Sequence, residues 1–248
     1  MPAVKRTGTL PDIDSFNFTP GRIIAKKYEI ISLLGAGWEG EVYKIIETRT
    51  GIERAAKFFF PKRNIKDSAA KFYAKKLHKL RQCPILIQYH HQETISFRNQ
   101  PITCLISEFV DGEMLSDFVA RQPGKRLSVY EGLHLLHAIA SGMDCIHRHR
   151  EYHGDLHDGN VMIKRRGLEF DIKILDLFYM TSAKSELIQT DVNDMVRILY
   201  DCIGGAKHYA KHPPQVKGIC NGLKQTLIRK KFRTAGQLQR YLENMEWD

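Results

Sequence analysis

Residues 153–160, His-Gly-Asp-Leu-His-Asp-Gly-Asn, constrain this chain more than any other segment of its sequence. They contain a carboxylate, Asp155, and an amide five residues later, Asn160. A second carboxylate, Asp176, follows sixteen residues further on, at the end of a short apolar stretch. Carboxylate and amide oxygens are the ligands that Mg²⁺ prefers in proteins. The pattern therefore predicts Asn160 and Asp176 as magnesium ligands, with Asp155 as a candidate general base.

The composition is that of a chain with a well-buried core. Of its 248 residues, 43% are hydrophobic and 27% are charged, which suffices for one large domain or two small lobes. No run approaches the roughly 18 uninterrupted apolar residues of a membrane-spanning helix. Residues 1–21 are polar, contain three prolines and lack the apolar stretch of a secretory signal, so they are predicted to be a flexible N-terminal arm.

The cysteines are odd in number and scattered, and none belongs to a C-x-x-C pair. They are Cys83, Cys104, Cys145, Cys202 and Cys220. This usage favours a reducing, cytoplasmic location over a disulfide framework or a thiolate zinc site. His147, His149 and His153 lie close together in the sequence, but without a companion carboxylate set they do not predict zinc.

The first half of the chain has the pattern of an antiparallel sheet with a single helix. Short apolar runs, some rich in β-branched residues and one followed by a Thr-Gly turn, predict five strands. They cover residues 28–34, 42–48, 52–60, 85–89 and 102–109. Apolar spacings of three and four predict an amphipathic helix over residues 67–80, which Pro84 ends.

Helical periodicity dominates after Asp111-Gly112, the predicted hinge. Ser128, with Glu131 three residues later, has capping-box spacing at the start of a long helix that reaches about Arg148. Two strands are predicted over residues 161–164 and 172–175, and three more helices over 191–202, 216–228 and 234–243. The predicted fold class is α+β with two lobes: a small antiparallel β-sheet with one helix over residues 22–110, and a mainly helical lobe over residues 111–248.

Residues 35–42, Gly-Ala-Gly-Trp-Glu-Gly-Glu-Val, contain the pattern G-x-G-x-x-G-x-V. Such glycines alone are weak evidence, because they also occur in dinucleotide-binding folds. Here they lie between two predicted antiparallel strands and not between a strand and a helix, so the dinucleotide hypothesis fails. Glycine lets backbone amides approach phosphate oxygens closely. Lys57 lies on the next strand, where its ammonium group is expected to reach the same phosphates.

In this order and spacing, the motifs resemble those of the protein-kinase superfamily across residues 28–245. The resemblance implies phosphate transfer from ATP to a hydroxyl group, with Mg²⁺ as cofactor. The residues that it implies for ATP binding are Gly35, Ala36, Gly37, Trp38, Gly40, Val42 and Lys57, with the backbone of Glu108 and Val110 for adenine. It implies Asp155 and His157 as catalytic residues, Asn160 and Asp176 as metal ligands, and Asp191 as a buried aspartate that steadies the catalytic loop.

Several positions depart from the usual kinase pattern. His153-Gly154-Asp155 replaces H-R-D, and H-G-D-L-H-x-G-N is similar to the loop of aminoglycoside- and choline-type phosphotransferases and of atypical prokaryotic kinases. His157 either contacts the γ-phosphate or caps the loop. Asp176-Leu177-Phe178 replaces D-F-G. Asp191 follows Asp176 by only fifteen positions, with no A-P-E between them, which leaves little room for a peptide-binding segment.

The predicted helix after Lys57 contains no glutamate, although kinases place an ion-pair partner of this lysine there. Its inward stripe offers Tyr73 and Leu77 instead. Glu41 and Glu93 are candidate substitutes for the missing partner. Alternatively the helix moves, or the activity is weak.

Three functions fit these motifs. The favoured one is an atypical serine/threonine protein kinase with a protein substrate. The second is a small-molecule kinase of aminoglycoside or choline type, which the catalytic loop and the missing peptide platform support. The third is a non-catalytic kinase-like module that binds nucleotide at most, which the missing helix glutamate supports.

The net charge of +10 is concentrated in residues 62–81, where eight Lys or Arg residues accompany one acid, Asp67. Such a patch can attract an acidic protein or a nucleic acid. No aromatic platform interrupts it and no nucleic-acid motif is present. A solvated helix face or a protein contact is therefore the simpler interpretation.

Overall fold

The computed structural model describes residues 12–167, 169–177 and 183–246, and the chain divides into two units. Unit 1 contains the described residues up to 78 together with residues 88–109. Unit 2 contains residues 79–87 and the described residues from 110 onward. The segment 79–87 thus belongs to the second unit, although the sequence prediction placed it in the first lobe.

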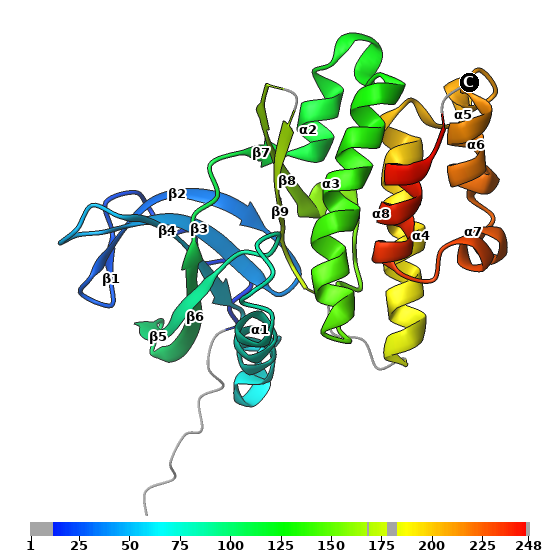
Figure 1. The fold of residues 1–248 in the computed structure, drawn as a ribbon. Coiled ribbons are helices and arrows are strands. Elements are labelled where there is room, and N and C mark those ends of the chain that lie inside the picture. The colour runs from blue at the N-terminus through cyan, green and yellow to red at the C-terminus, as the bar shows by residue number, and fades with distance from the viewer. Residues whose placement is uncertain (1–11, 168, 178–182, 247–248) are drawn as a thin grey trace, which may run out of the picture. The chain divides into compact units, whose positions relative to one another are not determined.

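Unit 1 is built on a six-stranded antiparallel sheet with the order β1-β2-β3-β4-β6-β5 (Figure 1). Its strands are β1 (Ile23–Ile24), β2 (Tyr28–Ala36), β3 (Gly40–Glu47), β4 (Glu53–Phe59), β5 (Tyr89–Phe97) and β6 (Gln100–Glu108). Four of the predicted strands are confirmed, as β2, β3, β4 and β6. Their apolar residues alternate along the chain because successive side chains of a strand point to opposite faces of the sheet.

The register of β3 and β4 decides which side chains share a face. Val42 lies opposite Lys57, and the neighbouring residues of each strand point to the other face. That other face carries Tyr43, Ile45 and Phe58, which are fully or almost fully buried. One face of the sheet is therefore apolar core, and the opposite face holds the lysine.

The predicted helix of unit 1 is confirmed as α1 (Ser68–Lys79), which follows a 3₁₀ turn (Ile65–Asp67). Its buried stripe includes Ala70, Tyr73 and Leu77, at the spacings seen in the sequence. The Asn64 side chain accepts a hydrogen bond from the Ala70 amide at 3.1 Å, which satisfies one of the donors at the start of the helix.

The prediction of a flexible arm over residues 1–21 is wrong for its described part. Ile13, Phe16 and Phe18 are buried in the core of unit 1, with 2%, 3% and 6% of their surface exposed. The Phe16 ring stacks on Phe60 with centroids 5.3 Å apart. Its amide donates to Glu41 Oε1 at 3.2 Å. The alternating aromatic residues Phe16 and Phe18 pack this segment on the sheet. The prediction relied on the polar, proline-containing composition and did not consider them. Residues 1–11 lie outside the described residues.

Residues 85–89 do not form the predicted strand. The Ile174 amide donates to the Ile85 carbonyl at 2.7 Å, and Leu86 forms an isolated parallel bridge with Ile174. Ile85 and Leu86 are buried in unit 2, so the apolar pattern resembles that of a strand although this segment forms only one isolated bridge. The fifth long strand, β5, begins at Tyr89 instead.

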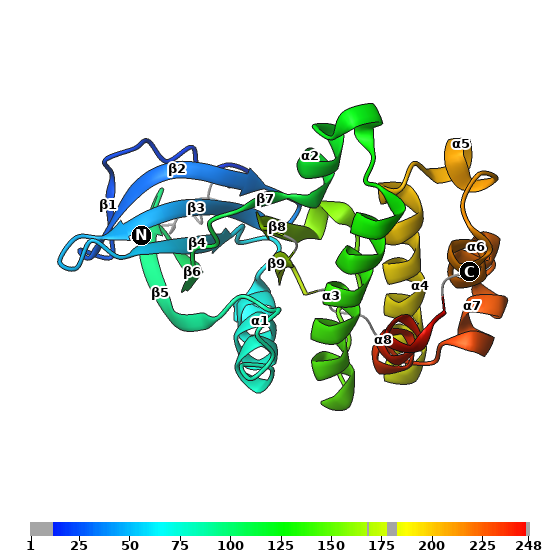
Figure 2. The same ribbon diagram turned by 45° about the horizontal axis from the view of Figure 1, so that its top comes forward.

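Unit 2 combines a three-stranded antiparallel sheet with helices (Figures 1 and 2). The strands are β7 (Glu113–Met114), β8 (Val161–Arg166) and β9 (Glu169–Ile174). The helices are α2 (Leu115–Ala120), α3 (Val129–Arg148), α4 (Lys184–Cys202), α5 (Gly205–Tyr209), α6 (Pro214–Cys220), α7 (Gln225–Lys231) and α8 (Ala235–Asn244). No helix in the described part of the chain is both long enough and apolar enough to cross a membrane.

The long helices α3 and α4 run side by side in both views (Figures 1 and 2). Gly132 of α3 permits this approach, because a Cβ there would lie 2.5 Å from Ile203 Cγ2 at the end of α4. Ser128 caps α3 and exchanges hydrogen bonds with Glu131, which confirms the predicted capping box. Thr234 caps α8 in the same way, by accepting from the Gln237 amide.

Two helix predictions need correction. The helix expected over residues 216–228 is divided into α6 and α7, because Asn221 and Gly222 adopt positive φ angles of 46° and 58°. Such angles end a right-handed helix. The helix expected from Asp191 begins earlier, at Lys184. The first turns of α4 are polar and lack the apolar periodicity on which the prediction relied.

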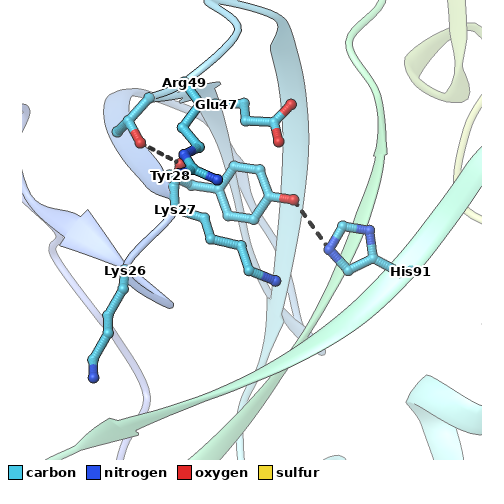
Figure 3. A pocket seen from close by; sticks show the side chains of 7 residues that line it. Lys26, Lys27, Tyr28, Glu47, Arg49 and His91 are labelled. Carbon is cyan, nitrogen blue, oxygen red and sulfur yellow. Dashed lines mark hydrogen bonds between the residues drawn. The ribbon is translucent and has the colours of Figure 1, made fainter.

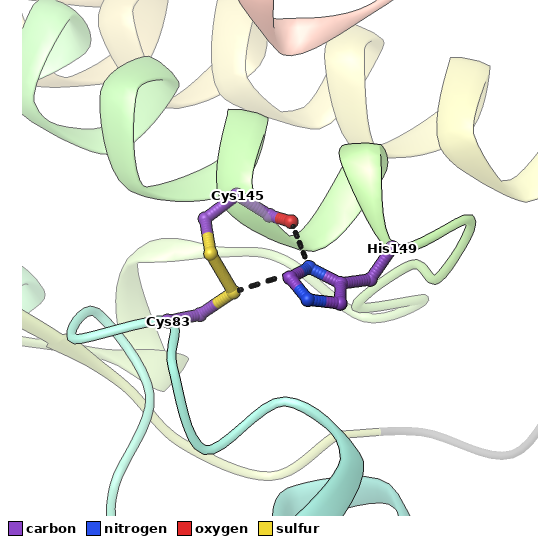
Figure 4. A group of neighbouring side chains, drawn as sticks. All are labelled: Cys83, Cys145 and His149. Atoms are coloured by element: carbon purple, nitrogen blue, oxygen red, sulfur yellow. Dashed lines mark hydrogen bonds between the residues drawn. A yellow bond between two sulfur atoms is a disulfide. The ribbon is translucent and has the colours of Figure 1, made fainter.

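The expectation that the cysteines form no disulfide is wrong for Cys83 and Cys145, whose Cα atoms are 5.6 Å apart in a disulfide (Figure 4). They are 62 residues apart in sequence, and their approach follows from the packing of segment 79–87 on α3. A Cβ on Gly142 of α3 would lie 2.2 Å from Ile85 Cδ1. His149 Nδ1 donates to the Cys145 carbonyl at 2.8 Å. Sulfur atoms joined in this way are not thiolate ligands for a metal.

The remaining cysteines are buried thiols. They are Cys104, Cys202 and Cys220. Burial, the largest cause, raises the pKa of each thiol to about 12. They therefore remain protonated and behave as small apolar residues of the core.

Removing the Phe16 ring tests the docking of the N-terminal segment. We expect Phe16→Ala to lower the free energy of unfolding by about 3–5 kcal/mol, the usual cost of emptying a buried aromatic site. Chemical denaturation followed by circular dichroism measures the change. Tyr130→Ala, which removes a ring that is 57% exposed on α3, is the matched control and should cost little. Equal losses in the two variants would contradict the docking.

Candidate functional site

The glycine loop of unit 1 connects β2 to β3, with the Gly37 amide donating to the Gly40 carbonyl at 2.9 Å. Glycine occupies positions in this loop for two different structural reasons. A Cβ on Gly40 would lie 1.8 Å from the Phe58 carbonyl oxygen, so this position is glycine because the loop packs directly on β4. A Cβ on Gly35 or Gly37 would meet no atom within 4 Å. The backbone at these two positions is therefore open to a ligand.

Trp38 is exposed at the tip of this loop, with 67% of its surface accessible. The guanidinium carbon of Arg63 lies 3.9 Å from the centroid of its ring, a cation–π contact. The loop tip is thus held to the segment that follows β4.

Lys57 contacts a carboxylate that sequence reasoning missed. Its Nζ lies 3.1 Å from Oε2 of Glu39, a residue of the glycine loop itself. The Tyr73 hydroxyl of α1 donates to the same oxygen at 2.9 Å. The Lys57 ammonium also lies 4.2 Å from the centroid of the Tyr73 ring. The sequence did contain a signal for this partner. Glu39 is an acidic residue within the glycine pattern, just before β3, the strand that pairs with β4.

The two predicted substitutes for the helix glutamate have other partners. Glu41 accepts from the Tyr43 hydroxyl and from the Phe16 amide, on the core side of the sheet. Burial, followed by this bond, raises the pKa of Tyr43 to about 12. Glu93 pairs with Lys27 at 2.8 Å. Strand alternation explains the error at Glu41. Glu41 directly precedes Val42 in the strand, so its side chain points to the face opposite the one that Val42 and Lys57 share.

Glu108, the last residue of β6, has its amide bonded to the Gln88 carbonyl at 2.9 Å. The sequence assigns the backbone of this residue, its amide and its carbonyl oxygen, to adenine. The Ser107 hydroxyl lies 3.4 Å from that oxygen. Val110 follows in the connecting segment, outside any helix or strand.

In unit 2, the carboxylate of Asp191 is fully buried and holds the loop that carries Asp155, the predicted catalytic loop. Oδ2 accepts from the His153 amide at 2.8 Å, and Oδ1 accepts from the Gly154 amide at 2.9 Å. His147 Nε2 lies 3.2 Å from Oδ2. The Ala235 amide donates to His147 Nδ1, so Nε2 carries the ring proton and donates to the carboxylate. These bonds offset the cost of burying the charge.

His153 is a buried structural histidine. Its Nδ1 accepts from the Asp155 amide at 3.2 Å, so its Nε2 carries the proton and donates to the Leu175 carbonyl at 2.6 Å. The Leu175 amide in turn donates to the Asn160 carbonyl at 2.9 Å. The loop of Asp155 and the residue before Asp176 are thereby fixed to one another.

The predicted catalytic and metal-binding residues of unit 2 lie on these two connected segments. Asn160 Nδ2 donates to the Asp155 carbonyl at 2.9 Å, which leaves the amide oxygen to coordinate a cation. His157 Nδ1 accepts from the Gly159 amide at 3.0 Å, so this side chain caps the loop, and its Nε2 is 3.8 Å from Asp155 Oδ2. Asp155 and Asp176 are exposed. Hard oxygen donors of this kind fit Mg²⁺.

Asp176 has a positive φ of 51°. A non-glycine residue in this region carries backbone strain, which is common where a side chain must be aimed at a ligand. Leu177 behind it is buried. Phe178, the third residue of the predicted Asp-Leu-Phe motif, lies outside the described residues.

Asp194 of α4 was not predicted from the sequence. Burial, followed by the negative charges of Asp191 and Asp155, raises its pKa from 3.8 to about 7. Arg197 opposes the shift. Asp194 is thus a third acidic group near Asp155 and Asp191. The sequence did not reveal it, because its proximity to them depends on how α4 packs beside the loop that carries Asp155.

A separate hollow of unit 1 is lined by residues at the opposite end of β2 from the glycine loop (Figure 3). Its lining residues are Lys26, Lys27, Tyr28, Glu47, Thr48, Arg49 and His91. The Tyr28 hydroxyl and His91 Nε2 are 3.0 Å apart across it. Since it contains none of the predicted ATP-binding residues, it is distinct from the candidate site.

The family model of the protein kinase domain matches residues 28–194, well over half of the chain. Human death-associated protein kinase 2 is 31% identical over 154 residues, covering 60% of this chain and 40% of that protein. A probable serine/threonine-protein kinase PknB of Lactococcus lactis is 27% identical over 207 residues, covering 80% of this chain and 29% of that protein. The chain therefore spans well under half the length of these relatives.

The crystal structure of the Mycobacterium tuberculosis PknI kinase domain, as a C20A_R136A double mutant, has a similar fold. The TM-score is 0.65 and the sequence identity 18%, and the match covers 93% of this chain and 98% of that one. This likeness confirms the predicted α+β fold class with its antiparallel sheet and mainly helical second lobe.

The raised pKa of Asp194 predicts how stability depends on pH. The folded protein binds a proton at Asp194 that the unfolded chain releases, so the contribution of this residue to stability falls as pH rises from about 4 to about 7. Asp194→Asn should remove this loss and stabilise the protein at pH 8 by roughly 1–2 kcal/mol, after allowance for partial exposure.

Thermal melts at pH 5 and pH 8 measure this effect. The difference between Asp194→Asn and the wild type should grow between the two values. Asp14→Asn, at an exposed position, is the control and should show no such growth. A constant difference across this range would contradict the proton bound at Asp194.

Proposed function

Because the chain belongs to the protein kinase family, we propose that it transfers the γ-phosphate of ATP to a serine or threonine hydroxyl group of a protein. The observation that carries this proposal is the loop of unit 2, where Asp191 fixes the backbone next to Asp155 through two amide hydrogen bonds. The matched family region begins before the glycine loop and includes Asp155, Asn160, Asp176 and Asp191. Relatives named as serine/threonine kinases support the type of acceptor.

The proposal assigns nucleotide binding in unit 1 to the glycine loop and β4. The open backbone at Gly35 and Gly37 binds phosphate oxygens, and Lys57 contributes the positive charge. Val42 shares the face of Lys57 and contacts the base. The other assigned residues are Ala36, Trp38 and Gly40 of the loop, and the backbone of Glu108 and Val110 for adenine.

In unit 2, Asp155 accepts or orients the proton of the attacking hydroxyl group. That oxygen forms a bond to the γ-phosphorus as the bond to the bridging oxygen breaks, and ADP leaves. Asn160 and Asp176 would hold Mg²⁺, which supplies positive charge against the phosphates when bound. His157 shapes this loop by accepting from the Gly159 amide, and its ring is near enough to influence Asp155.

A small-molecule acceptor is the second candidate, and one observation favours it. Only residues 177–183 connect Asp176 to α4, because this helix begins at Lys184. A short connection offers little surface for a peptide. The similarity of residues 153–160 to the loop of aminoglycoside- and choline-type phosphotransferases points the same way.

The proposal includes a cytoplasmic location, where ATP is supplied, but no nucleic-acid partner. Several basic side chains of residues 62–81 already have contacts within the molecule. Lys62 pairs with Asp12, Arg63 lies over Trp38, and Lys76 is 6% exposed. An acidic or nucleic-acid partner at this segment therefore stays a prediction without further support. A cytoplasmic location also implies that Cys83 and Cys145 meet reducing conditions in the cell.

Asp155→Ala should lower kcat by roughly 10²–10⁴-fold, the usual contribution of a positioned general base. Transfer of labelled phosphate from ATP measures the rate. Asp158→Ala changes an exposed acid in the same loop and is the matched control, with near wild-type turnover expected. An unchanged rate in Asp155→Ala would exclude the role of general base.

Tracing the label distinguishes the two acceptor classes. With γ-labelled Mg-ATP, added protein substrates and a small-molecule metabolite extract, a protein kinase puts the label on protein, whereas a small-molecule kinase puts it on a soluble metabolite. Asp176→Asn should abolish the magnesium-dependent transfer while leaving the melting temperature within a few degrees of the wild type, since its side chain is exposed. If the wild type transfers phosphate to neither class of acceptor, both kinase hypotheses are wrong and the non-catalytic, nucleotide-binding module is the hypothesis that remains.

A further inference from the structure

The lysine of unit 1 requires a carboxylate partner that α1 does not provide. The sequence of this helix, Ser-Ala-Ala-Lys-Phe-Tyr-Ala-Lys-Lys-Leu-His-Lys, contains no acidic residue. Kinases orient the corresponding lysine with a glutamate on this helix. In this chain Tyr73 lies against the lysine instead, and the negative charge comes from the glycine loop.

One oxygen atom joins the three side chains. Glu39 Oε2 receives hydrogen bonds from Lys57 Nζ at 3.1 Å and from the Tyr73 hydroxyl at 2.9 Å. The Tyr73 ring presents its face to the same ammonium group at 4.2 Å. The side chains of Lys57 and Glu39 are 18% and 24% exposed, so water screens this pair less than an exposed surface pair.

The backbone fixes where the Glu39 carboxylate can lie. The Phe60 amide donates to the Glu39 carbonyl at 2.9 Å. The next residue, Gly40, packs on the Phe58 carbonyl so closely that no side chain fits. The preceding residue, Trp38, is held by Arg63. The loop tip is therefore tied to β4, the strand that carries Lys57, and the carboxylate is presented to the ammonium group by a closed loop.

We propose that Glu39 and Tyr73 are positioning residues that orient Lys57 toward the phosphates of ATP, in place of a helix glutamate. The Glu39 carboxylate supplies the charge, and Tyr73 fixes that carboxylate from α1. This inference rests on the proposed function, in which Lys57 binds the phosphates. It also couples two parts that kinases usually keep separate, because the glycine loop that covers the phosphates also orients the lysine.

The rival account is competition. If the Glu39 carboxylate occupies the position of a phosphate, it must leave Lys57 before ATP binds, and its removal should tighten ATP binding. The contact with Tyr73 favours positioning, because a second donor on α1 holds the carboxylate where it is. The two accounts predict opposite signs for the change in ATP affinity.

Calorimetry of ATP and adenosine binding separates the accounts without needing turnover. Glu39→Ala should weaken ATP binding by about tenfold, while adenosine, which has no phosphates, should bind as to the wild type. Glu39→Asp should recover part of the loss. Tyr73→Phe keeps the ring and removes the hydroxyl group, so a smaller loss of about two- to fivefold is expected. Tyr73→Phe should add less in the Glu39→Ala background than in the wild type, because the carboxylate that the hydroxyl contacts is then absent.

Glu53→Gln is the matched control, because it removes the carboxylate that pairs with Lys44 elsewhere on the sheet. It should leave ATP affinity unchanged, and all variants should melt within a few degrees of the wild type. Tighter or unchanged ATP binding in Glu39→Ala overturns the proposal, as does an equal change for adenosine. A wild type that binds ATP but transfers no phosphate refutes the proposed function alone. A wild type that binds no ATP refutes both.

Discussion

A single buried carboxylate organises the second unit of this molecule. Asp191 has no exposed surface, and its charge would be costly in such a place without donors. It receives those donors from the backbone amides of His153 and Gly154 and from His147 at the end of α3. His147 in turn accepts from the first amide of α8. One negative charge therefore determines the placement of the loop that carries Asp155.

His153 extends this arrangement to the segment that carries Asp176, a predicted metal ligand. Its ring accepts from the Asp155 amide and donates to the Leu175 carbonyl, so a neutral histidine connects the loop to the end of β9. In kinases with H-R-D, the middle residue adds a charged side chain. Here Gly154 takes that place, and the Asp191 carboxylate binds its backbone amide directly. This loop is held by hydrogen bonds between its backbone amides and two side chains, the Asp191 carboxylate and the His153 ring.

Sequence patterns predicted those helices and strands whose evidence lies within the element itself. Alternating apolar residues located β2, β3, β4 and β6, and the Ser128–Glu131 pair located the start of α3. The errors have a common cause. Residues 85–89 and the aromatic residues at 16 and 18 have side chains whose partners are distant in the sequence, so no periodicity reveals their roles. The Cys83–Cys145 disulfide also depends on such a packing contact.

The amino-acid sequence by itself determined the order and chemistry of the candidate site: the glycines, the lysine, the acid–amide pair of the loop and the acid after β9. These residues are recognised by spacing, because each motif is continuous along the chain. Only the tertiary structure decided which charge accompanies Lys57. Glu39 reaches it because the turn between β2 and β3 folds back on β4, and strand alternation directs Glu41 to the core instead. Which side chains contact one another across neighbouring strands depends on strand register and steric fit, and neither can be read from a single sequence.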